Sequence, residues 1–210
     1  MVEVGSEPAH GASGPTVLWL VRHGITDAVG NWLSGRLAGV PLNREGTEQA
    51  ARLGSFFASQ ALAAVYSSPL ERALDTAAAI SRPHGLTVVE RADLTDIDFG
   101  QWTGSSLSEL RNDPAFHRFN QQRALACPPK GEAAFEVQAR VVRALSELTR
   151  LHPGSSLVVV AHADPLRAAL AFLLGMSLDF AERLEISPGS ATRLEIAANV
   201  RLCGLNHVPA

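Results

Sequence analysis

The sequence predicts an α/β fold of three layers, in which a mainly parallel central sheet is covered by helices on both faces. Short apolar runs alternate with amphipathic stretches along most of the chain, a pattern typical of parallel strands joined by helices. The runs at 17–21 and 157–161 are apolar without alternation, as expected of strands buried on both faces. The 210 residues are 46% hydrophobic and 19% charged, which is enough apolar material for a buried core.

Residues 1–15 are expected to form a flexible tail and residues 16–210 a single domain. The first fifteen residues contain no Lys or Arg and no apolar run of signal-peptide length, and later apolar runs are too short to span a bilayer. The net charge is −3, which gives no basic footprint for nucleic acid. Cys127 and Cys203 form no C-x-x-C pair. These features favour a cytoplasmic protein with free thiols and neither a membrane nor a nucleic-acid partner.

The first half of the expected domain alternates strands with capped helices. Asn43 is expected to cap a helix whose apolar residues recur at helical spacing. Ser68 is expected to cap the next helix, because Pro69 suits the first helical position and Glu71 completes an S-x-x-E capping box. This second helix should end at about residue 80. Strands are expected at 17–21, 63–66 and 86–90.

The second half begins with a looser stretch from 93 to about 130, where Gly and Pro punctuate expected short helices. A long amphipathic helix is expected at 132–151, because its apolar residues fall on one face. The buried strand at 157–161 is followed by a helix that starts at Asp164-Pro165 and ends at about residue 174. Apolar and polar residues alternate at 192–196 and 201–205, which predicts a terminal hairpin.

Polar side chains follow three of the expected strands. Arg22 and His23 follow the first strand, the serine pair at 67–68 follows the second, and His162 follows the strand at 157–161. Arg72 lies in the first turn of a helix, where a cation is unfavourable unless an anion joins it. Ligands of parallel sheets bind beyond the carboxyl ends of the strands. Two imidazoles, two guanidiniums and two helix N-termini at one edge therefore predict a site for a phosphoryl group.

The residue types also indicate what chemistry this site performs. The sequence has no P-loop, DFG or G-x-S-x-G motif and no carboxylate cluster suited to a metal pair. Without a metal ion, the natural acceptor of a phosphoryl group is an imidazole nitrogen whose ring partner is held as a donor. A carboxyl group kept protonated can then supply the proton that the departing oxygen requires.

The residues from Leu20 to Thr26 (LVRHGIT) resemble the LVRHGxT signature of the histidine phosphatase superfamily, which has the phosphoglycerate mutase-like fold. The similarity extends over about 17–205, and RHG, SSPLxRAxxTA, FGxWxG and a late strand-ending His follow in the family's order. The further matching segments are Gly35-Arg36, Pro41 to Gly46, Tyr66 to Ala73 with Thr76-Ala77, Asp98 to Gly104, Gly131-Glu132 and Val160-Ala161-His162.

This resemblance implies roles for individual residues. His23 would be the nucleophile that becomes phosphohistidine, and Arg22, Arg72 and His162 would bind the phosphoryl group. Thr26 and Ala163 would contribute to substrate binding. The position of the family's acidic Glu, aligned on Phe99-Gly100, is Asp96. Aspartate is one methylene shorter than glutamate, so either Asp96 is the proton donor, or Asp98 replaces it, or the enzyme is weakened.

Two further positions depart from the family pattern. Val29 stands where many members have an Asn that contacts phosphate, and Asn31 is an alternative if the loop is shifted. The sequence after the second histidine is Ala163-Asp164-Pro165, where many members have Gly-Gly. Candidates for substrate contact outside the phosphate pocket are Arg36, Arg111, Arg118 and Arg123, with Trp32 or Phe116 at the mouth.

Together these observations predict a metal-independent phosphatase that hydrolyses small phosphorylated metabolites through a phosphohistidine and needs no cofactor. A cofactor-dependent phosphomutase is the main alternative, but the segment at 113–130 is short and has only three basic residues. A weakly active protein that binds a phosphorylated ligand is the other alternative. A homodimer is left open.

Overall fold

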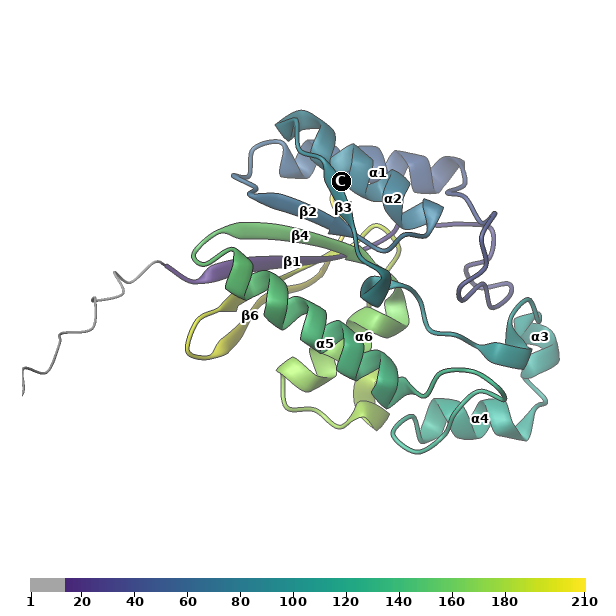
Figure 1. Cartoon of the computed structure of the whole chain (residues 1–210). Coiled ribbons are helices and arrows are strands. Elements are labelled where there is room, and N and C mark those ends of the chain that lie inside the picture. The colour runs from purple at the N-terminus through teal and green to yellow at the C-terminus, as the bar shows by residue number, and fades with distance from the viewer. Residues whose placement is uncertain (1–13) are drawn as a thin grey trace, which may run out of the picture.

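The structure is a computed structural model that describes residues 14–210 (Figure 1). The expected tail at 1–15 therefore falls almost wholly outside the described residues. Within the described range, the helices include none with the length and apolar character needed to cross a membrane.

One sheet of six strands forms the middle layer, in the order β3-β2-β4-β1-β5-β6. Neighbouring strands among β1 to β4 pair in parallel, whereas β5 is antiparallel to both β1 and β6. The predicted terminal hairpin is thus confirmed. The strands are β1 (Thr16–Arg22), β2 (Ala64–Ser67), β3 (Val88–Glu90), β4 (Ser156–Ala161), β5 (Ala191–Ile196) and β6 (Val200–His207).

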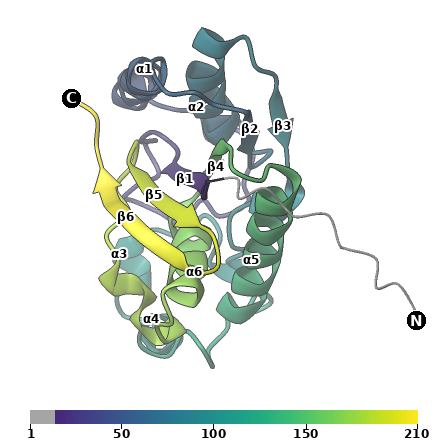
Figure 2. The same cartoon turned by 90° about the vertical axis from the view of Figure 1, so that its left-hand side faces the viewer.

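Helices cover both faces of this sheet, as predicted. In Figures 1 and 2, α1 and α2 lie on one side of the strands and α5 and α6 on the other. The short helices α3 and α4 lie beyond one end of the sheet (Figure 1). The α-helices are α1 (Arg44–Phe57), α2 (Glu71–Ser81), α3 (Leu107–Leu110), α4 (Pro114–Gln121), α5 (Ala134–Leu151) and α6 (Ala163–Leu173), and the 3₁₀ segments are η1 (Arg82–His84), η2 (Ala92–Leu94), η3 (Gly100–Trp102) and η4 (Leu178–Arg183).

Alternate residues of the central strands enter two separate apolar clusters. Leu18 and Leu20 of β1 belong to the cluster that contains residues of α5 and α6. Trp19 and Val21 of the same strand belong to the cluster that contains residues of α1 and α2. Since successive side chains of a strand point to opposite faces, the unbroken apolar runs in the sequence reflect burial on both faces. This packing explains the three-layer architecture.

The helix starts agree with the sequence at one site and differ at another. The Asn43 side chain caps α1, because its Oδ1 accepts a hydrogen bond from the Gly46 N–H at 2.9 Å. The capping box predicted at Ser68 is wrong, since α2 begins only at Glu71 and its N-cap, Leu70, has no side-chain hydrogen bond. Ser68 lies two residues too early, directly after β2. Its hydroxyl accepts from the Leu70 N–H at 3.3 Å and is hydrogen-bonded to the ring of His162 at 2.8 Å.

Candidate active site

Three neighbouring parallel strands end at the same edge of the sheet and bring the predicted residues together. β4 lies between β2 and β1. The His23 N–H donates to Ala161 O at 3.1 Å, and the Ser68 N–H donates to Val160 O at 2.9 Å. The residues that follow β1, β2 and β4 are therefore fixed side by side. They lie at a cavity of about 320 Å³, whose wall includes Arg22, His23, Asp96, His162 and Ala163.

The His23 ring is held in one tautomer. Its Nδ1 lies 2.7 Å from Gly24 O, and because a carbonyl only accepts, Nδ1 carries the proton and Nε2 keeps its lone pair. Gly24 is itself fixed, since its N–H donates to Thr76 Oγ1 at 3.1 Å. A Cβ at Gly24 would lie 2.5 Å from Gly46 O, so this close approach requires glycine.

The surroundings of His23 keep its imidazole uncharged. The residue is only 5% exposed. Burial, followed by the nearby charges of Arg72 and Arg22, lowers the pKa of His23 to about 3. The ring is therefore neutral at pH 7, which is the form in which an imidazole nitrogen can attack phosphorus.

His162 lies against His23 at the end of β4. The two ring centroids are 5.0 Å apart, a separation at which both rings can contact oxygen atoms of one phosphoryl group. His162 Nε2 is 2.8 Å from Ser68 Oγ. Its Nδ1 is buried without a hydrogen-bond partner among the described residues. Burial and the charges of neighbouring basic residues lower the pKa of His162.

Two guanidiniums with unused donors lie at the site: Arg22 lines the cavity, whereas Arg72 does not line it but lies against Asp96. Arg72 is fully buried and donates to Gly35 O at 2.6 Å, while Arg22 donates to Ile186 O at 2.7 Å. The Nε atoms of both arginines are buried and unpaired within the described part of the chain. Because buried donors in folded proteins are normally satisfied, these unpaired groups fit a site that receives an anion.

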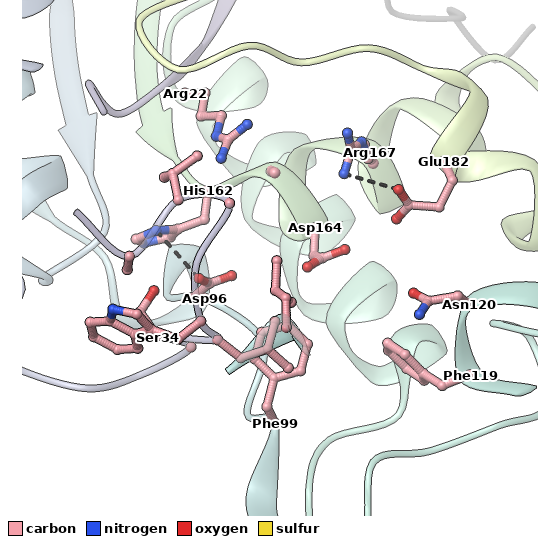
Figure 3. A pocket seen from close by; sticks show the side chains of 18 of the residues that line it. Arg22, Ser34, Asp96, Phe99, Phe119, Asn120, His162, Asp164, Arg167 and Glu182 are labelled. Carbon is pink, nitrogen blue, oxygen red and sulfur yellow. Dashed lines mark ion pairs between the residues drawn. The ribbon is translucent and has the colours of Figure 1, made fainter. Parts of the chain in front are cut away.

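Asp96 lies between these cations and the second histidine. Its Oδ2 is 3.7 Å from His162 Nδ1 (Figure 3) and 3.6 Å from Arg72 Nη2. Its Oδ1 accepts from the Ile97 N–H at 2.9 Å. Burial, and after it the negative charge of Asp164, raises the pKa of Asp96 to about 7, although Arg72 acts in the opposite direction. The carboxyl group is therefore partly protonated near neutral pH, as a proton donor requires.

The structure places some of the remaining candidate site residues at the cavity and others away from it. Asp98 is not among the cavity-lining residues, and its Oδ1 accepts from the Gly100 N–H at 2.8 Å. Val29 lines the cavity, whereas the Asn31 side chain donates to Asp27 O at 2.9 Å. Thr26 is buried but does not line the cavity.

The far end of the cavity holds features that the sequence analysis only partly anticipated. Trp32 and Phe116 both line it, as predicted, and Phe99 and Phe119 do so as well. Of the four arginines considered for substrate contact, only Arg123 lines this cavity.

Four charged side chains, which we call the distal quartet, also line this end: Arg123, Asp164, Arg167 and Glu182. Arg123 donates to Asp164 at 2.5 Å and pairs with Glu182 at 2.5 Å. Arg167 pairs with Glu182 at 3.2 Å (Figure 3). Sequence reasoning missed the quartet because its members come from different elements. The one signal was the unusual Asp164 after the second histidine.

This chain is similar to several known proteins. The family described as the histidine phosphatase superfamily (branch 1) matches residues 18–204. A bifunctional protein of Mycobacterium tuberculosis is 36% identical over 201 residues, which cover 91% of this chain and 55% of that protein. Phosphoserine phosphatase 1 of Hydrogenobacter thermophilus is 32% identical over 167 residues, 77% of each chain. The solved structure of YhfR from Bacillus stearothermophilus has a TM-score of 0.84 at 30% identity and covers 90% of this chain and 95% of that one. This chain spans about half the length of the bifunctional protein.

Proposed function

Because this chain belongs to the histidine phosphatase superfamily, we propose that it is a phosphatase that hydrolyses small-molecule phosphomonoesters through a phosphohistidine on His23. The observation that carries the proposal is the pair of imidazoles with centroids 5.0 Å apart, with the two guanidiniums of Arg22 and Arg72 beside them. The name of the Hydrogenobacter thermophilus relative, a phosphoserine phosphatase, supports phosphatase chemistry. The identity of the substrate belongs to the proposal.

In the first step, His23 Nε2 attacks the phosphorus atom of the bound monoester. The P–N bond forms while the P–O bond to the leaving group breaks, and the Asp96 proton passes to the departing oxygen. Arg22 and Arg72 balance the negative charge on the equatorial oxygens. His162 donates a hydrogen bond to the same group through Nδ1, the ring nitrogen without a partner among the described residues, while the Ser68 hydroxyl donates to Nε2 and orients the ring.

In the second step, water discharges the phosphohistidine. The ionised Asp96 accepts a proton from the attacking water, the new P–O bond forms and the P–N bond breaks. Inorganic phosphate leaves, His23 regains its lone pair and Asp96 regains its proton, so that the cycle closes. No metal ion enters either step, and we expect activity to be unchanged in EDTA.

The distal quartet favours a phosphatase over a phosphomutase. A mutase must hold a product that carries further negative charge while the phosphoryl group returns to it. Here both distal guanidiniums already pair with carboxylates, so no uncompensated cation in the quartet is free to hold that charge. This arrangement therefore favours water as the acceptor of the phosphoryl group.

The test is hydrolysis of p-nitrophenyl phosphate by the wild type, His23→Ala and His207→Ala, with and without EDTA. His207 is an exposed histidine of β6 and is the matched control. We expect roughly a 10⁴-fold loss or more for His23→Ala, because the nucleophile is removed, and no loss for His207→Ala. Brief incubation with a radiolabelled substrate should leave acid-labile label on the wild type and on His207→Ala, but not on His23→Ala.

Three outcomes would contradict the proposal. Turnover by His23→Ala at the wild-type rate would remove the phosphohistidine. No turnover by any of the three proteins would favour a binding protein. Stable label on His23 that returns to the product without net release of phosphate would favour a mutase.

A further inference from the structure

We propose that Asp164 is a specificity-determining residue, which neutralises Arg123 and thereby adapts the distal half of the cavity to uncharged leaving groups while excluding those that carry a carboxylate. This inference rests on the proposed phosphatase function. It concerns the part of the substrate that lies beyond the phosphoryl group. We call the part of the site formed by Arg22, His23, Arg72, Asp96 and His162 the phosphate half, and the part lined by the distal quartet the distal half. The imidazoles and guanidiniums of the phosphate half do not select among leaving groups.

Both cations of the distal quartet are paired with carboxylates, although Arg123 Nε is buried without a hydrogen-bond partner among the described residues. Arg123 is 7% exposed and donates to Asp164 Oδ1 at 2.5 Å and to Asn120 Oδ1 at 3.2 Å. It also forms an ion pair with Glu182 Oε1 at 2.5 Å. Arg167 pairs with Glu182 and donates to Leu184 O at 2.9 Å. Two guanidiniums thus face two carboxylates, and the quartet has no net charge.

The two halves of the cavity therefore offer different charge to a substrate. Arg22 and Arg72 match the two negative charges of a bound phosphate. A carboxylate on the leaving group would enter the distal half beside Asp164 and Glu182, with no unpaired cation to compensate its loss of water. Burial favours the neutral form of Asp164, but Arg123 and Arg167 outweigh it and lower the pKa of this carboxyl, so the repelling charge is present at neutral pH.

The other residues that line the distal half of the cavity indicate which kind of leaving group would fit there. Trp32, Phe99, Phe116 and Phe119 provide apolar faces, and Asn120 provides an amide. An ionised carboxylate only accepts hydrogen bonds, so Asp164 selects for a group that donates them. An uncharged leaving group with hydroxyls and an apolar face meets both requirements, whereas a carboxylate meets neither.

The experiment compares two esters with the same three-carbon skeleton, glycerol 3-phosphate and 3-phosphoglycerate, which differ in a hydroxymethyl group against a carboxylate. Each is measured as a competitor of p-nitrophenyl phosphate hydrolysis, so that its inhibition constant is obtained even if it is a poor substrate. We expect the wild type to bind glycerol 3-phosphate at least about tenfold more tightly, since an uncompensated like charge is costly.

Two variants test the cause of this preference. Asp164→Asn keeps the shape and removes the charge, and Glu182→Gln does the same at a side chain that is 37% exposed, where the change is easily accommodated. Each should shrink the ratio of the two inhibition constants about tenfold, mainly by tighter binding of 3-phosphoglycerate. Asp75→Asn, at an exposed position of α2, is the matched control and should leave the ratio unchanged. Any change at Asp96 affects both esters alike and cancels in the ratio.

The outcomes separate this inference from the proposed function. If the wild type and the variants hydrolyse p-nitrophenyl phosphate but the ratio stays at its wild-type value in both variants, the specificity role of Asp164 is overturned and the phosphatase remains. A wild type that prefers 3-phosphoglycerate would overturn it equally. If the wild type does not hydrolyse p-nitrophenyl phosphate, the proposed function fails and this inference fails with it.

Discussion

The two halves of the cavity are built in different ways. The phosphate half takes Arg22 from the last position of β1, and His23 and His162 from the positions directly after β1 and β4. Backbone hydrogen bonds between these neighbouring strands fix the spacing of the three residues. The distal half takes its charged side chains from α6, from η4 and from the loop after α4. In such folds a rigid sheet positions the chemistry, and the surrounding helices and loops vary the recognition.

The two halves also differ in charge. The phosphate half contains two guanidiniums, those of the half-buried Arg22 and the fully buried Arg72, and one carboxyl group, that of Asp96. In the distal half, two carboxylates balance the two guanidiniums. The two halves interact electrostatically at Asp96, because the negative charge of Asp164 in the distal half contributes to the raised pKa of Asp96. We therefore expect changes in the phosphate half to alter the rate for every substrate, and changes in the distal half to alter the choice among substrates.

Apart from removal of the nucleophile in His23→Ala, the largest expected effect within the phosphate half comes from Asp96→Asn. An amide cannot donate the proton that an alkoxide leaving group needs, so kcat/KM for an alkyl phosphate should fall about 10² to 10⁴-fold. An aryl phosphate needs little protonation and should lose less than about tenfold. Hydrolysis of glycerol 3-phosphate and of p-nitrophenyl phosphate by the same preparations measures both losses.

Asp98→Asn is the matched control for this prediction, because Asp98 is two residues away and its carboxylate serves a local turn. It should leave the ratio between alkyl and aryl phosphates unchanged. Equal losses on both esters in Asp96→Asn would assign Asp96 to binding and remove it from proton transfer. A selective loss of the alkyl ester in Asp98→Asn would transfer that role to Asp98.

A smaller effect is expected from pH. Burial raises the pKa of Asp96 to about 7, and the proton donor must be protonated, so kcat/KM for an alkyl phosphate should fall about tenfold per pH unit above pH 7. The rate with p-nitrophenyl phosphate should stay nearly level from pH 7 to 9. His23, whose pKa is lowered to about 3, stays neutral throughout this range and therefore adds no further pH dependence to the rate.

The same profile links the two halves of the cavity. Asp164→Asn removes a negative charge that raises the pKa of Asp96, so the fall in rate should begin at a lower pH. Burial remains the larger cause, and the shift is therefore only partial. An unchanged profile in Asp164→Asn would make the halves electrostatically independent, and a level profile in the wild type would remove Asp96 as the titrating group.

The two halves also differ in how much of them could be predicted from the sequence: most of the phosphate half could be, whereas the charge pairing of the distal half could not. Unbroken apolar runs identify β1 and β4, and an ordered parallel sheet places whatever follows them at one edge. His23 and His162 are 139 positions apart, yet the strand register brings them together. Asn43 illustrates the same success at a helix start, where a short side chain bonds to a backbone group three residues away.

The unpredicted features depend on contacts that have no local pattern. Arg123 and Asp164 are 41 residues apart and meet only because the segment after α4 packs near the start of α6. Ser68 was misassigned for a related reason. Its local sequence satisfies a capping box, but a histidine 94 residues away takes up its hydroxyl, and the helix starts later.

The smallest expected effect is at this serine. Removing the hydroxyl in Ser68→Ala leaves His162 without the hydrogen bond that orients its ring, and a hydrogen bond between uncharged groups contributes about 0.5–1.5 kcal/mol. We therefore expect kcat/KM to fall about two- to twelvefold, equally for alkyl and aryl phosphates, because in the proposed mechanism His162 contacts the phosphoryl group that all substrates share. Ser81→Ala, a buried serine at the end of α2 whose hydroxyl bonds Ala78 O, controls for the loss of a buried hydroxyl and should retain full activity at an equal loss of thermal stability. A loss in Ser68→Ala that differed between leaving groups would show that the Ser68–His162 pair takes part in recognition, and the division between the two halves would no longer hold.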